Sequence, residues 1–250
     1  MSGSEDDGGA PLRPLSARSV VLSLLLGTHP PELPARDLVR LVEEFDVGRS
    51  TARAALSRMA AAGDLARTEG GYRLSQRLLV RQRRQDEAVH PRTRAWDGDW
   101  EMLVITATGR GPAERAELRT RLTSLRLAEL REGVWLRPAN LRRPLPEGLD
   151  AVGERLVTRP GRPAPELAAR LWPLEGWSRT ARDLLGRVAR ARRPADRLTA
   201  FAAVVRHLLA DPVLPAELLP SDWPGAELRD AYTEYQREQA GRVRAGGTRT

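Results

Sequence analysis

The chain has 250 residues, of which 41% are hydrophobic and 30% charged, and its formal net charge is +8. A chain of this length has room for roughly two domains, each with its own core. No apolar run approaches the roughly 20 residues that span a bilayer, so no membrane partner is expected. The absence of cysteine excludes disulfides, thiolate metal sites and cysteine nucleophiles.

All 41 strongly basic side chains are arginines, and they are spread evenly along the sequence. A positive net charge favours a polyanionic partner, but an even distribution does not say where the partner binds. The complete lack of lysine also fits a general codon bias towards arginine. A case for nucleic-acid binding must therefore rest on the pattern of residues and not on charge.

The first ten residues are acidic and rich in glycine and serine, and they lack the basic start and apolar centre of a signal peptide. Residues 1–13 are therefore predicted to form a disordered tail of a cytoplasmic protein. The first helix is predicted over Pro14–Thr28, with Ser16 as its cap and Gly27 at its end.

Two further helices follow with a short connection between them. They are predicted from Pro34 to about Glu44 and over Arg49–Ala62, and a joint of about four residues with an apolar residue and a glycine is typical of a helix-turn-helix. Beyond them, Leu65–Arg67 and Tyr72–Leu74 are placed to pair across the turn Glu69-Gly70-Gly71. Three helices and a hairpin in this order predict a winged helix-turn-helix.

The helix predicted over Arg49–Ala62 has two unlike faces. At about 100° per residue, one stripe is apolar, and the opposite face carries small side chains between arginines. Arginines hold phosphates or recognise guanine, and small side chains let the helix approach a groove closely. The predicted DNA-binding residues are Arg49, Ser50, Thr51, Arg53, Ala54, Ser57 and Arg58 on the helix, and Arg67 and Arg73 in the hairpin.

Other interpretations of these side chains stay open. Arg53 and Arg58 also suit a solvated helix face, and Thr51 suits a helix cap. Arg49 lies nearer the apolar stripe, which favours a phosphate contact over base recognition. The next segment, Ser75–Val89, is predicted to be a polar helix whose arginines either follow phosphates or cover a solvated connector, and it completes a first domain over residues 14–90.

A second domain is predicted over residues 91–165. Its expected elements are a strand at Met102–Thr108, an arginine-rich helix at Pro112–Leu130, and strands at Gly133–Pro138 and Glu154–Thr158. This order predicts a small α+β sandwich in which helices cover one face of one sheet. Residues 159–165 are predicted to be a linker.

Residues 166–241 are predicted to form a third, helical domain, and residues 242–250 a second disordered tail. The expected helices are Leu167–Trp172, Glu175–Ala191, Ala195–Ala210 and Gly225–Ala240. Repeated prolines interrupt the segment before the last helix.

Four stretches together resemble the PaaX family of bacterial transcriptional regulators, which is named for repression of phenylacetic acid catabolism. They are STARAALSR at Ser50–Arg58, WDGDW at Trp96–Trp100, GVWLRP at Gly133–Pro138 and LPAELLPSDWPG at Leu214–Gly225. They occur in the family's order over roughly residues 14–240. The resemblance implies a mainly α chain with α+β parts: a winged helix-turn-helix, a central ferredoxin-like (Cas2-like) α+β domain and a helical C-terminal domain.

The resemblance also implies a homodimer that binds a palindromic double-stranded operator, represses an aromatic-acid catabolic operon and is released by an aryl-CoA thioester. The hairpin departs from the family, because it is short and carries Glu69 at its tip where a longer, basic wing is usual. The segment between Pro138 and Glu166 is also compact, so an effector pocket built there would differ from the family's.

Trp172, Trp177, Arg179 and Arg182 form the candidate effector site. Aromatic faces suit an aryl group, and guanidinium groups suit the phosphates of CoA. The alternative is that these tryptophans, like the other four, pack in the core or between domains.

No catalytic residue, metal site or cofactor is predicted. The three histidines are isolated, without the spacing of metal ligands. The alternatives to a repressor are a winged-helix protein-interaction module and a Cas2-like metal-dependent nuclease. The nuclease would need carboxylates at the end of the strand Met102–Thr108, but Asp97 and Asp99 lie before its start.

Overall fold

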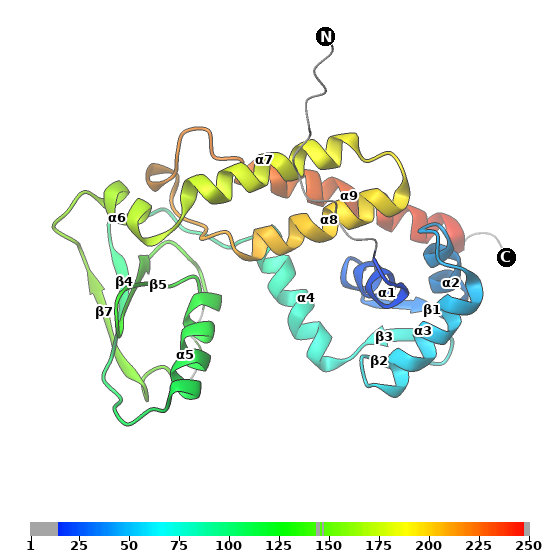
Figure 1. Cartoon of the computed structure of the whole chain (residues 1–250), viewed down its shortest axis with the longest axis horizontal. Coiled ribbons are helices and arrows are strands. Elements are labelled where there is room, and N and C mark those ends of the chain that lie inside the picture. Colours follow the sequence, from blue (N-terminus) through cyan, green and yellow to red (C-terminus); the bar gives the residue numbers. More distant parts are fainter. Residues whose placement is uncertain (1–14, 144–145, 147, 248–250) are drawn as a thin grey trace, which may run out of the picture. The chain divides into compact units, whose positions relative to one another are not determined.

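The computed structural model describes residues 15–143, 146 and 148–247, and their packing forms two compact units (Figure 1). The first unit contains the described residues up to 83 together with 184–205 and 231–247, and the second contains residues 84–183 and 206–230. The segment predicted as a third, helical domain therefore contributes to both units. The predicted tail of residues 1–13 lies outside the described residues.

The first unit contains the three predicted helices, α1 (Ala17–Leu26), α2 (Ala35–Glu43) and α3 (Arg49–Ala61), within a few residues of their expected bounds. The Ser16 hydroxyl accepts the backbone N–H of Ser19 at 3.2 Å, and Gly27 ends α1, as predicted. The apolar faces of the three helices pack against one another and form the core of the unit. The helix-turn-helix prediction is confirmed.

The predicted hairpin is also present, as β2 (Leu65–Arg67) and β3 (Gly71–Leu74). A third strand, β1 (Glu32–Pro34), pairs with β3 and places it in the centre of the sheet. Strand β1 was not predicted, because the prolines around it indicate only an extended link. A Cβ on Gly71 would lie 2.1 Å from the carbonyl oxygen of Leu33, so only glycine lets the two strands approach this closely.

One buried carboxylate joins the parts of the winged helix. Gly63 ends α3 with a φ of 70°, and the N–H of Asp64 then bonds the carbonyl oxygen of Met59 at 2.9 Å, which is a Schellman turn. This turn buries the side chain of Asp64, which accepts two hydrogen bonds from Arg18 of α1, at 3.0 and 2.7 Å, and one from Arg77. Asp64 therefore links α1, the end of α3 and the following helix.

That following helix, α4 (Gln76–Val89), was predicted as a polar connector. Its buried Gln82 donates hydrogen bonds from Nε2 to the carbonyl oxygens of Leu26 and Thr28, each at 3.0 Å. These carbonyls lie at the end of α1, where no further turn of helix supplies a donor. The start of α4 is therefore anchored to the winged helix, whereas the arginines at positions 81, 83 and 84 stay exposed.

Three helices are divided between the two units: α7 (Leu174–Arg190), α8 (Pro194–Leu209) and α9 (Gly225–Gly247). Residues 184–205 and 231–247 belong to the first unit. Helix α9 runs to Gly247, so the predicted end at Ala240 and the predicted disorder from residue 242 are wrong as far as Gly247. Arg242 donates to Glu44 at 3.4 Å, and this contact gives the last turns of α9 a partner. Residues 248–250 lie outside the described part of the chain.

The second unit contains a four-stranded antiparallel sheet in the order β5-β6-β4-β7. Its elements are β4 (Trp100–Ile105), α5 (Pro112–Ser124), β5 (Ala128–Arg131), β6 (Val134–Pro138) and β7 (Gly153–Thr158). Strands β4 and β6, the first and third of this domain along the chain, lie in the centre of the sheet. Helix α5 joins β4 to β5. This is the ferredoxin-like arrangement, so the predicted fold class is confirmed.

The predicted helix Pro112–Leu130 is too long, because α5 ends at Ser124 and β5 follows. Arg126 has a φ of 62°, and the N–H of Leu127 bonds back to the carbonyl oxygen of Leu122 at 3.2 Å. The chain therefore turns out of the helix and starts a strand. The leucines of this segment fit a helical period up to Leu125 and an alternating period after it. The prediction extended the helical period as far as Leu130, which is why the predicted helix was too long.

Helices cover both faces of the sheet, and not one face as predicted. Leu103 of β4 packs in a cluster with Leu122 of α5, whereas Trp100, three positions earlier, packs with Leu167 of α6 (Ala164–Leu171). Positions 100 and 103 point to opposite faces because side chains alternate along a strand. A short 3₁₀ helix, η1 (Ala216–Leu218), adds Leu218 to the Trp100 cluster.

The role of Asp64 can be tested with Asp64→Ala. We expect the free energy of unfolding to fall by about 2–3 kcal/mol, because the variant loses three charge-assisted hydrogen bonds to a buried carboxylate. The matched control is Glu234→Ala, which removes an exposed ion pair with Arg237 in the same unit and should cost less than about 1 kcal/mol. Urea denaturation measures both, and equal losses would contradict the role given to Asp64.

Candidate nucleic-acid interface

Helix α3 buries one stripe and exposes the other, as its sequence predicts. Ala52, Ala55, Leu56 and Met59 are buried against α1 and α2. The seven residues predicted to contact DNA from this helix are all exposed. Four of them, Ser50, Arg53, Ala54 and Ser57, form a single outward ridge, because Arg53 and Ala54 each lie three or four residues from both Ser50 and Ser57.

The arginines of α3 differ in their partners. Arg49 donates from Nε and Nη2 to the carboxylate of Glu43, each at 3.1 Å, and this hydrogen bonding raises its pKa above the usual value. Arg53 and Arg58 are exposed and make no ion pair with any described residue. The unneutralised charge of α3 therefore lies on Arg53 and Arg58, while Arg49 is held at the end of α2.

The two predicted hairpin arginines lie on opposite faces of the small sheet. Arg67 is directly opposite Tyr72, and Arg73 is opposite Ala66 on one side and Glu32 on the other. Cross-strand partners share a face and neighbours along a strand do not, so Arg67 and Arg73 cannot point towards the same surface. The tip residue Glu69 is exposed.

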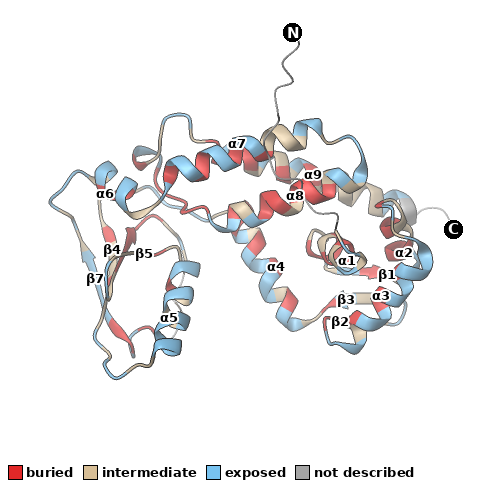
Figure 2. Cartoon of the chain, viewed as in Figure 1, coloured by how far each residue is buried: buried red, intermediate tan, exposed pale blue. Residues whose placement is uncertain are grey.

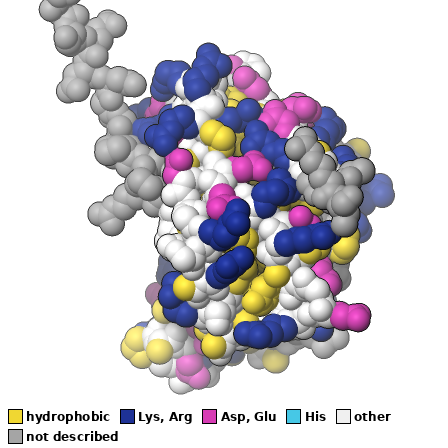
Figure 3. Space-filling model, turned by 90° about the vertical axis from the view of Figure 1, so that its right-hand side faces the viewer, with side chains coloured by type: hydrophobic (Ala, Val, Ile, Leu, Met, Phe, Trp, Pro, Cys, Tyr) yellow, Lys and Arg dark blue, Asp and Glu magenta, His cyan; other side chains and the backbone are white. Residues whose placement is uncertain are grey.

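Charge alone does not mark out a binding surface. Figure 3 shows dark blue basic side chains interspersed with magenta acidic ones over the face that it draws. This matches the even distribution of arginine along the sequence. The features that distinguish α3 are therefore its exposed ridge of small side chains and the two arginines without acidic partners.

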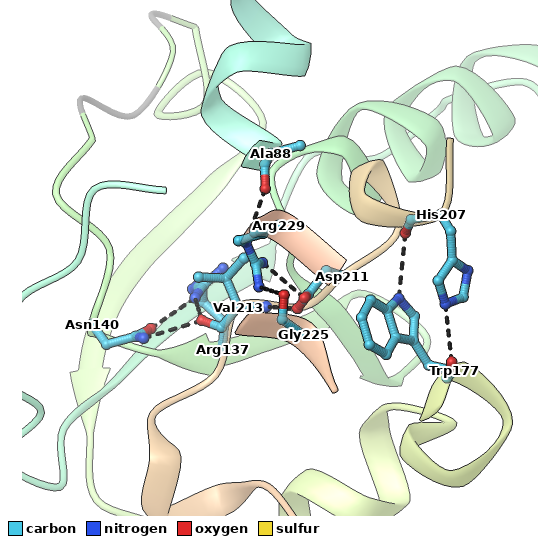
Figure 4. Close-up of polar contacts among 9 residues, drawn as sticks. All are labelled: Ala88, Arg137, Asn140, Trp177, His207, Asp211, Val213, Gly225 and Arg229. Carbon is cyan, nitrogen blue, oxygen red and sulfur yellow. Dashed lines mark hydrogen bonds and ion pairs between the residues drawn. The ribbon is translucent and has the colours of Figure 1, made fainter. Parts of the chain in front are cut away.

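The two tryptophans of the candidate effector site lie in different aromatic clusters. Trp177 is buried and stacks against His207 and Trp223, with ring centroids 4.4 and 4.3 Å away. Its Nε1 donates to the carbonyl oxygen of His207 at 3.3 Å, and His207 Nε2 donates to the carbonyl oxygen of Trp177 at 2.9 Å (Figure 4). Trp172 instead stacks on Trp100, 6.4 Å away. This packing fits the core alternative for both rings.

The arginines proposed with them also differ. Arg182 donates to the backbone carbonyl of Asp222 at 3.0 Å and pairs with its carboxylate. Arg179 is exposed and makes no ion pair with a described residue. The structure therefore does not gather the four residues into one open site.

A buried polar network in the second unit was missed by the sequence analysis. Arg137, on β6, is fully buried and donates to Asn140 Oδ1 at 2.8 Å and to the carbonyl oxygen of Val213 at 3.3 Å (Figure 4). It also donates to the carbonyl oxygen of Pro138 at 3.0 Å. Burial lowers the pKa of Arg137 to about 9. A charged residue inside the apolar strand GVWLRP was the available signal, since a buried charge needs fixed partners.

The network continues to α9. Asp211 accepts the N–H of Val213 at 2.7 Å and pairs with Arg229 at 2.8 Å, and Arg229 Nε donates to the carbonyl oxygen of Ala88 at 3.2 Å. Through these contacts the end of α4, the segment before η1 and the start of α9 are joined to β6. The network is structural, because its polar groups bond to one another.

The acidic side chains bear on the nuclease alternative. Among the described residues, no group of three or more His, Cys, Asp or Glu side chains is placed to hold a metal ion. Asp97 and Asp99 lie before β4, and Asp99 pairs with Arg159 at 2.5 Å. None of the described helices is long and apolar enough to cross a membrane.

The fold defines a winged helix-turn-helix protein with an added ferredoxin-like domain. Three family models match the chain: PaaX-like protein over residues 16–78, PaaX protein central Cas2-like domain over 93–155, and PaaX-like protein C-terminal domain over 166–245. The chain belongs to the PaaX family, and this assignment supports a PaaX-like regulator.

A solved structure is similar to this chain over most of its length. It is that of an uncharacterized protein, Rv0674, from Mycobacterium tuberculosis, which is 52% identical in sequence. The match covers 92% of this chain and 98% of that one, with a TM-score of 0.82. A search of curated proteins found no match.

The burial of His207 predicts a dependence of stability on pH. Burial lowers the pKa of His207 below its usual value of 6.5, so the unfolded chain takes up a proton at a higher pH than the folded chain. The free energy of unfolding should therefore fall as the pH falls from about 6.5 through the lower pKa of the folded state.

Urea denaturation at several pH values between about 7.5 and 5 measures this loss. His207→Gln should lose less stability than the parent over the same interval, because glutamine does not titrate. His90→Gln, at an exposed histidine, is the matched control and should follow the parent. Identical pH profiles for His207→Gln and the parent would contradict the assignment.

Proposed function

We propose that this protein is a homodimeric transcriptional repressor that inserts α3 into the major groove of a double-stranded operator. The observation that carries the proposal is the exposed ridge of α3, where small side chains surround Arg53, which makes no ion pair with a residue that the structure describes. A recognition helix must bring its backbone close to the base edges, and bulky side chains on this ridge would prevent it. Family membership supports a regulator of this kind.

The positions on α3 suggest separate tasks. Arg53 lies within the ridge, between Ser50 and Ser57, and is assigned to base recognition. Arg58 and Thr51 lie beside the ridge and are assigned to phosphates, together with Arg49, whose pairing with Glu43 keeps it at the start of the helix. Phosphate contacts fix the register of the helix, and the base contact supplies specificity.

The regulated genes and the effector follow from the family resemblance. We place the protein in the cytoplasm as the repressor of an aromatic-acid catabolic operon, relieved by an aryl-CoA thioester. Such an effector changes operator affinity only if it binds the DNA-competent and DNA-incompetent forms unequally. Of the four candidate effector residues, Arg179 is exposed without an acidic partner among the described residues, and Trp172 is partly exposed.

The second candidate function is a winged-helix protein-interaction module. It is favoured by the acidic side chain Glu69 at the tip of the wing and by the mixed charges of the surface in Figure 3. Specific, salt-sensitive binding to a duplex excludes it, because a protein-binding surface has no preference among DNA sequences.

The role of Arg53 is tested by Arg53→Ala. Binding to DNA from upstream of the protein's own gene should weaken by about 10- to 100-fold, the loss of one base contact worth about 1–3 kcal/mol. Arg192→Ala, at an exposed arginine between α7 and α8, changes the net charge equally and should bind like the parent. Fluorescence anisotropy with excess random duplex measures both, and equal affinities for the two variants would remove Arg53 from the interface.

Substituting Arg67 and Arg73 separately tests the wing. Because these side chains lie on opposite faces of the sheet, only one of the two alanine variants should weaken operator binding. The variant that matters should also lower the dependence of affinity on salt by about one counterion. Equal losses in both variants would contradict a wing that contacts DNA with a single face.

The same titration with phenylacetyl-CoA tests the effector class. Release of the operator by the thioester at constant salt supports the whole proposal. Specific operator binding that ignores the thioester retains the repressor and removes the aryl-CoA. Binding no tighter than to random duplex, by protein that is folded by circular dichroism, favours the protein-interaction module.

A further inference from the structure

Strand β7 lies at an edge of the sheet in the second unit. It pairs with β4 on one side, and among the described residues no strand pairs with its other side. Residues 154–157 are all exposed, and Figure 2 draws most of β7 in pale blue. Leu156 is 48% exposed and Val157 is 70% exposed, the two largest values among the exposed large hydrophobic residues that the structure describes. Soluble proteins usually protect such an edge with charges, prolines or bulges.

The backbone of β7 offers a defined set of hydrogen-bonding groups at this edge. The N–H of Thr106 bonds the carbonyl oxygen of Val152 at 3.2 Å, and the register continues with Met102 opposite Leu156. In an antiparallel ladder alternate residues bond the same neighbour, so Leu156 directs its backbone groups at β4. Arg155 and Val157 therefore present their N–H and C=O groups to the open edge.

This arrangement is self-complementary. When a second β7 strand lies antiparallel and is centred on Leu156, Arg155 of one copy bonds the partner's Val157, and the reverse pair forms by symmetry. Leu156 then lies directly opposite the partner's Leu156 in a close, non-hydrogen-bonded position. Glu154 lies opposite the partner's Thr158, so no like charges meet.

Neighbouring registers are less favourable. A pair centred on Arg155 places two arginines directly opposite each other, and a pair centred on Val157 places Arg155 opposite the partner's Arg159. Like charges at opposed positions destabilise a strand pair. Electrostatics and the leucine pair therefore select the register centred on Leu156.

A cavity lies at the same edge. It has a volume of about 160 Å³ and is lined mainly by apolar side chains, among them Leu103, Leu127, Leu149 and Val157. In the register centred on Leu156 the partner's Arg155 lies opposite Val157, on the face that carries Leu103. The aliphatic part of that arginine would lie over the cavity, while its guanidinium group pairs with Asp150 of its own chain at 2.7 Å.

We propose that β7 is the homodimer interface: two copies of this chain pair their β7 strands antiparallel about Leu156 and join their sheets into one continuous sheet. The inference rests on the homodimer of the proposed function and adds its location, its symmetry and its register. The two-fold axis passes through the Leu156 pair, which gives the dimer the symmetry that a palindromic operator requires.

Cysteine cross-linking tests the register, because the chain contains no cysteine of its own. In Leu156→Cys the two thiols lie within disulfide reach, since Cα atoms of a non-hydrogen-bonded pair are about 4.5 Å apart. Oxidised glutathione should convert them to one disulfide, taking up the two electrons and two protons, and a non-reducing gel should show a covalent dimer.

Two variants serve as controls. Val157 is more exposed than Leu156, but in the proposed register it lies opposite the partner's Arg155. Val157→Cys should therefore cross-link at least about tenfold more slowly than Leu156→Cys. Leu209→Cys, at a residue 41% exposed on α8, measures cross-linking by random collision. Equal cross-linking of the three variants, or none above the collision rate at position 156, overturns the proposal.

The oligomeric state tests the interface independently. The parent should have twice the chain mass of 27.7 kDa by light scattering, and Leu156→Lys with Val157→Lys should halve it. Leu209→Lys adds one charge at another exposed apolar residue and should stay dimeric. A dimeric double variant, or a monomeric parent, overturns the β7 interface. Operator affinity is measured separately, so a protein that binds its operator but dimerises elsewhere leaves the proposed function standing.

Discussion

The DNA-binding unit depends on a single buried carboxylate. Asp64 accepts hydrogen bonds from arginines of α1 and α4, and its backbone N–H closes the turn that ends α3. Its carbonyl oxygen accepts the N–H of Ser75, the residue after β3, at 3.0 Å. Its side chain is 5% exposed, whereas those of Arg18 and Arg77 are 54% and 71% exposed. The arrangement is favourable because only one charge is buried while both of its partners keep contact with water. It fixes where α3 stops, and therefore which face of α3 is presented.

The second unit handles buried charge differently. Arg137 has no acidic side chain as a direct hydrogen-bond partner, and its donors are shared among carbonyl oxygens and the amide of Asn140. Desolvation then dominates, which is why burial lowers its pKa. A buried arginine stabilises the fold only while the groups that accept its hydrogen bonds stay in place. Because one acceptor is the carbonyl oxygen of Val213, Arg137 joins β6 to the segment around Val213. Trp177 also joins separate segments of this unit, because its ring stacks against those of His207 and Trp223.

Sequence patterns predicted the parts of the fold that local periodicity determines. The helices of the winged unit, the Gly63 stop and the central strands all follow from apolar spacing and from residues with special backbone preferences. The predicted bounds were wrong where one segment fits two periods, or where a segment's structure depends on a contact with a distant part of the chain. Leu118–Leu130 fits a helix and then a strand, β1 is recognisable only once β3 is beside it, and the last turns of α9 depend on a contact between Arg242 and Glu44.

The exposed residues of α3 were predicted correctly as a surface because one face of a helix can be assigned from its sequence alone. Ion pairing could not be predicted in the same way. Nothing in the sequence separates Arg49, which Glu43 holds, from Arg53, which has no acidic partner among the described residues. The stacking of Trp177 against His207 and Trp223 likewise joins positions far apart in the chain. Candidate sites built from aromatic and basic residues are therefore less secure than those built on one helical face.

The discontinuous first unit has a consequence for synthesis of the protein. The turn before α3 is held by Arg193, which pairs with Asp46 at 2.6 Å, and by Arg242, which donates to Glu44. On the ribosome the winged helix emerges first, but these two arginines follow about 150 and 200 residues later. These contacts form only after the residues that supply them have been synthesised, so a nascent polypeptide that stops before Arg193 lacks both supports of its own recognition helix.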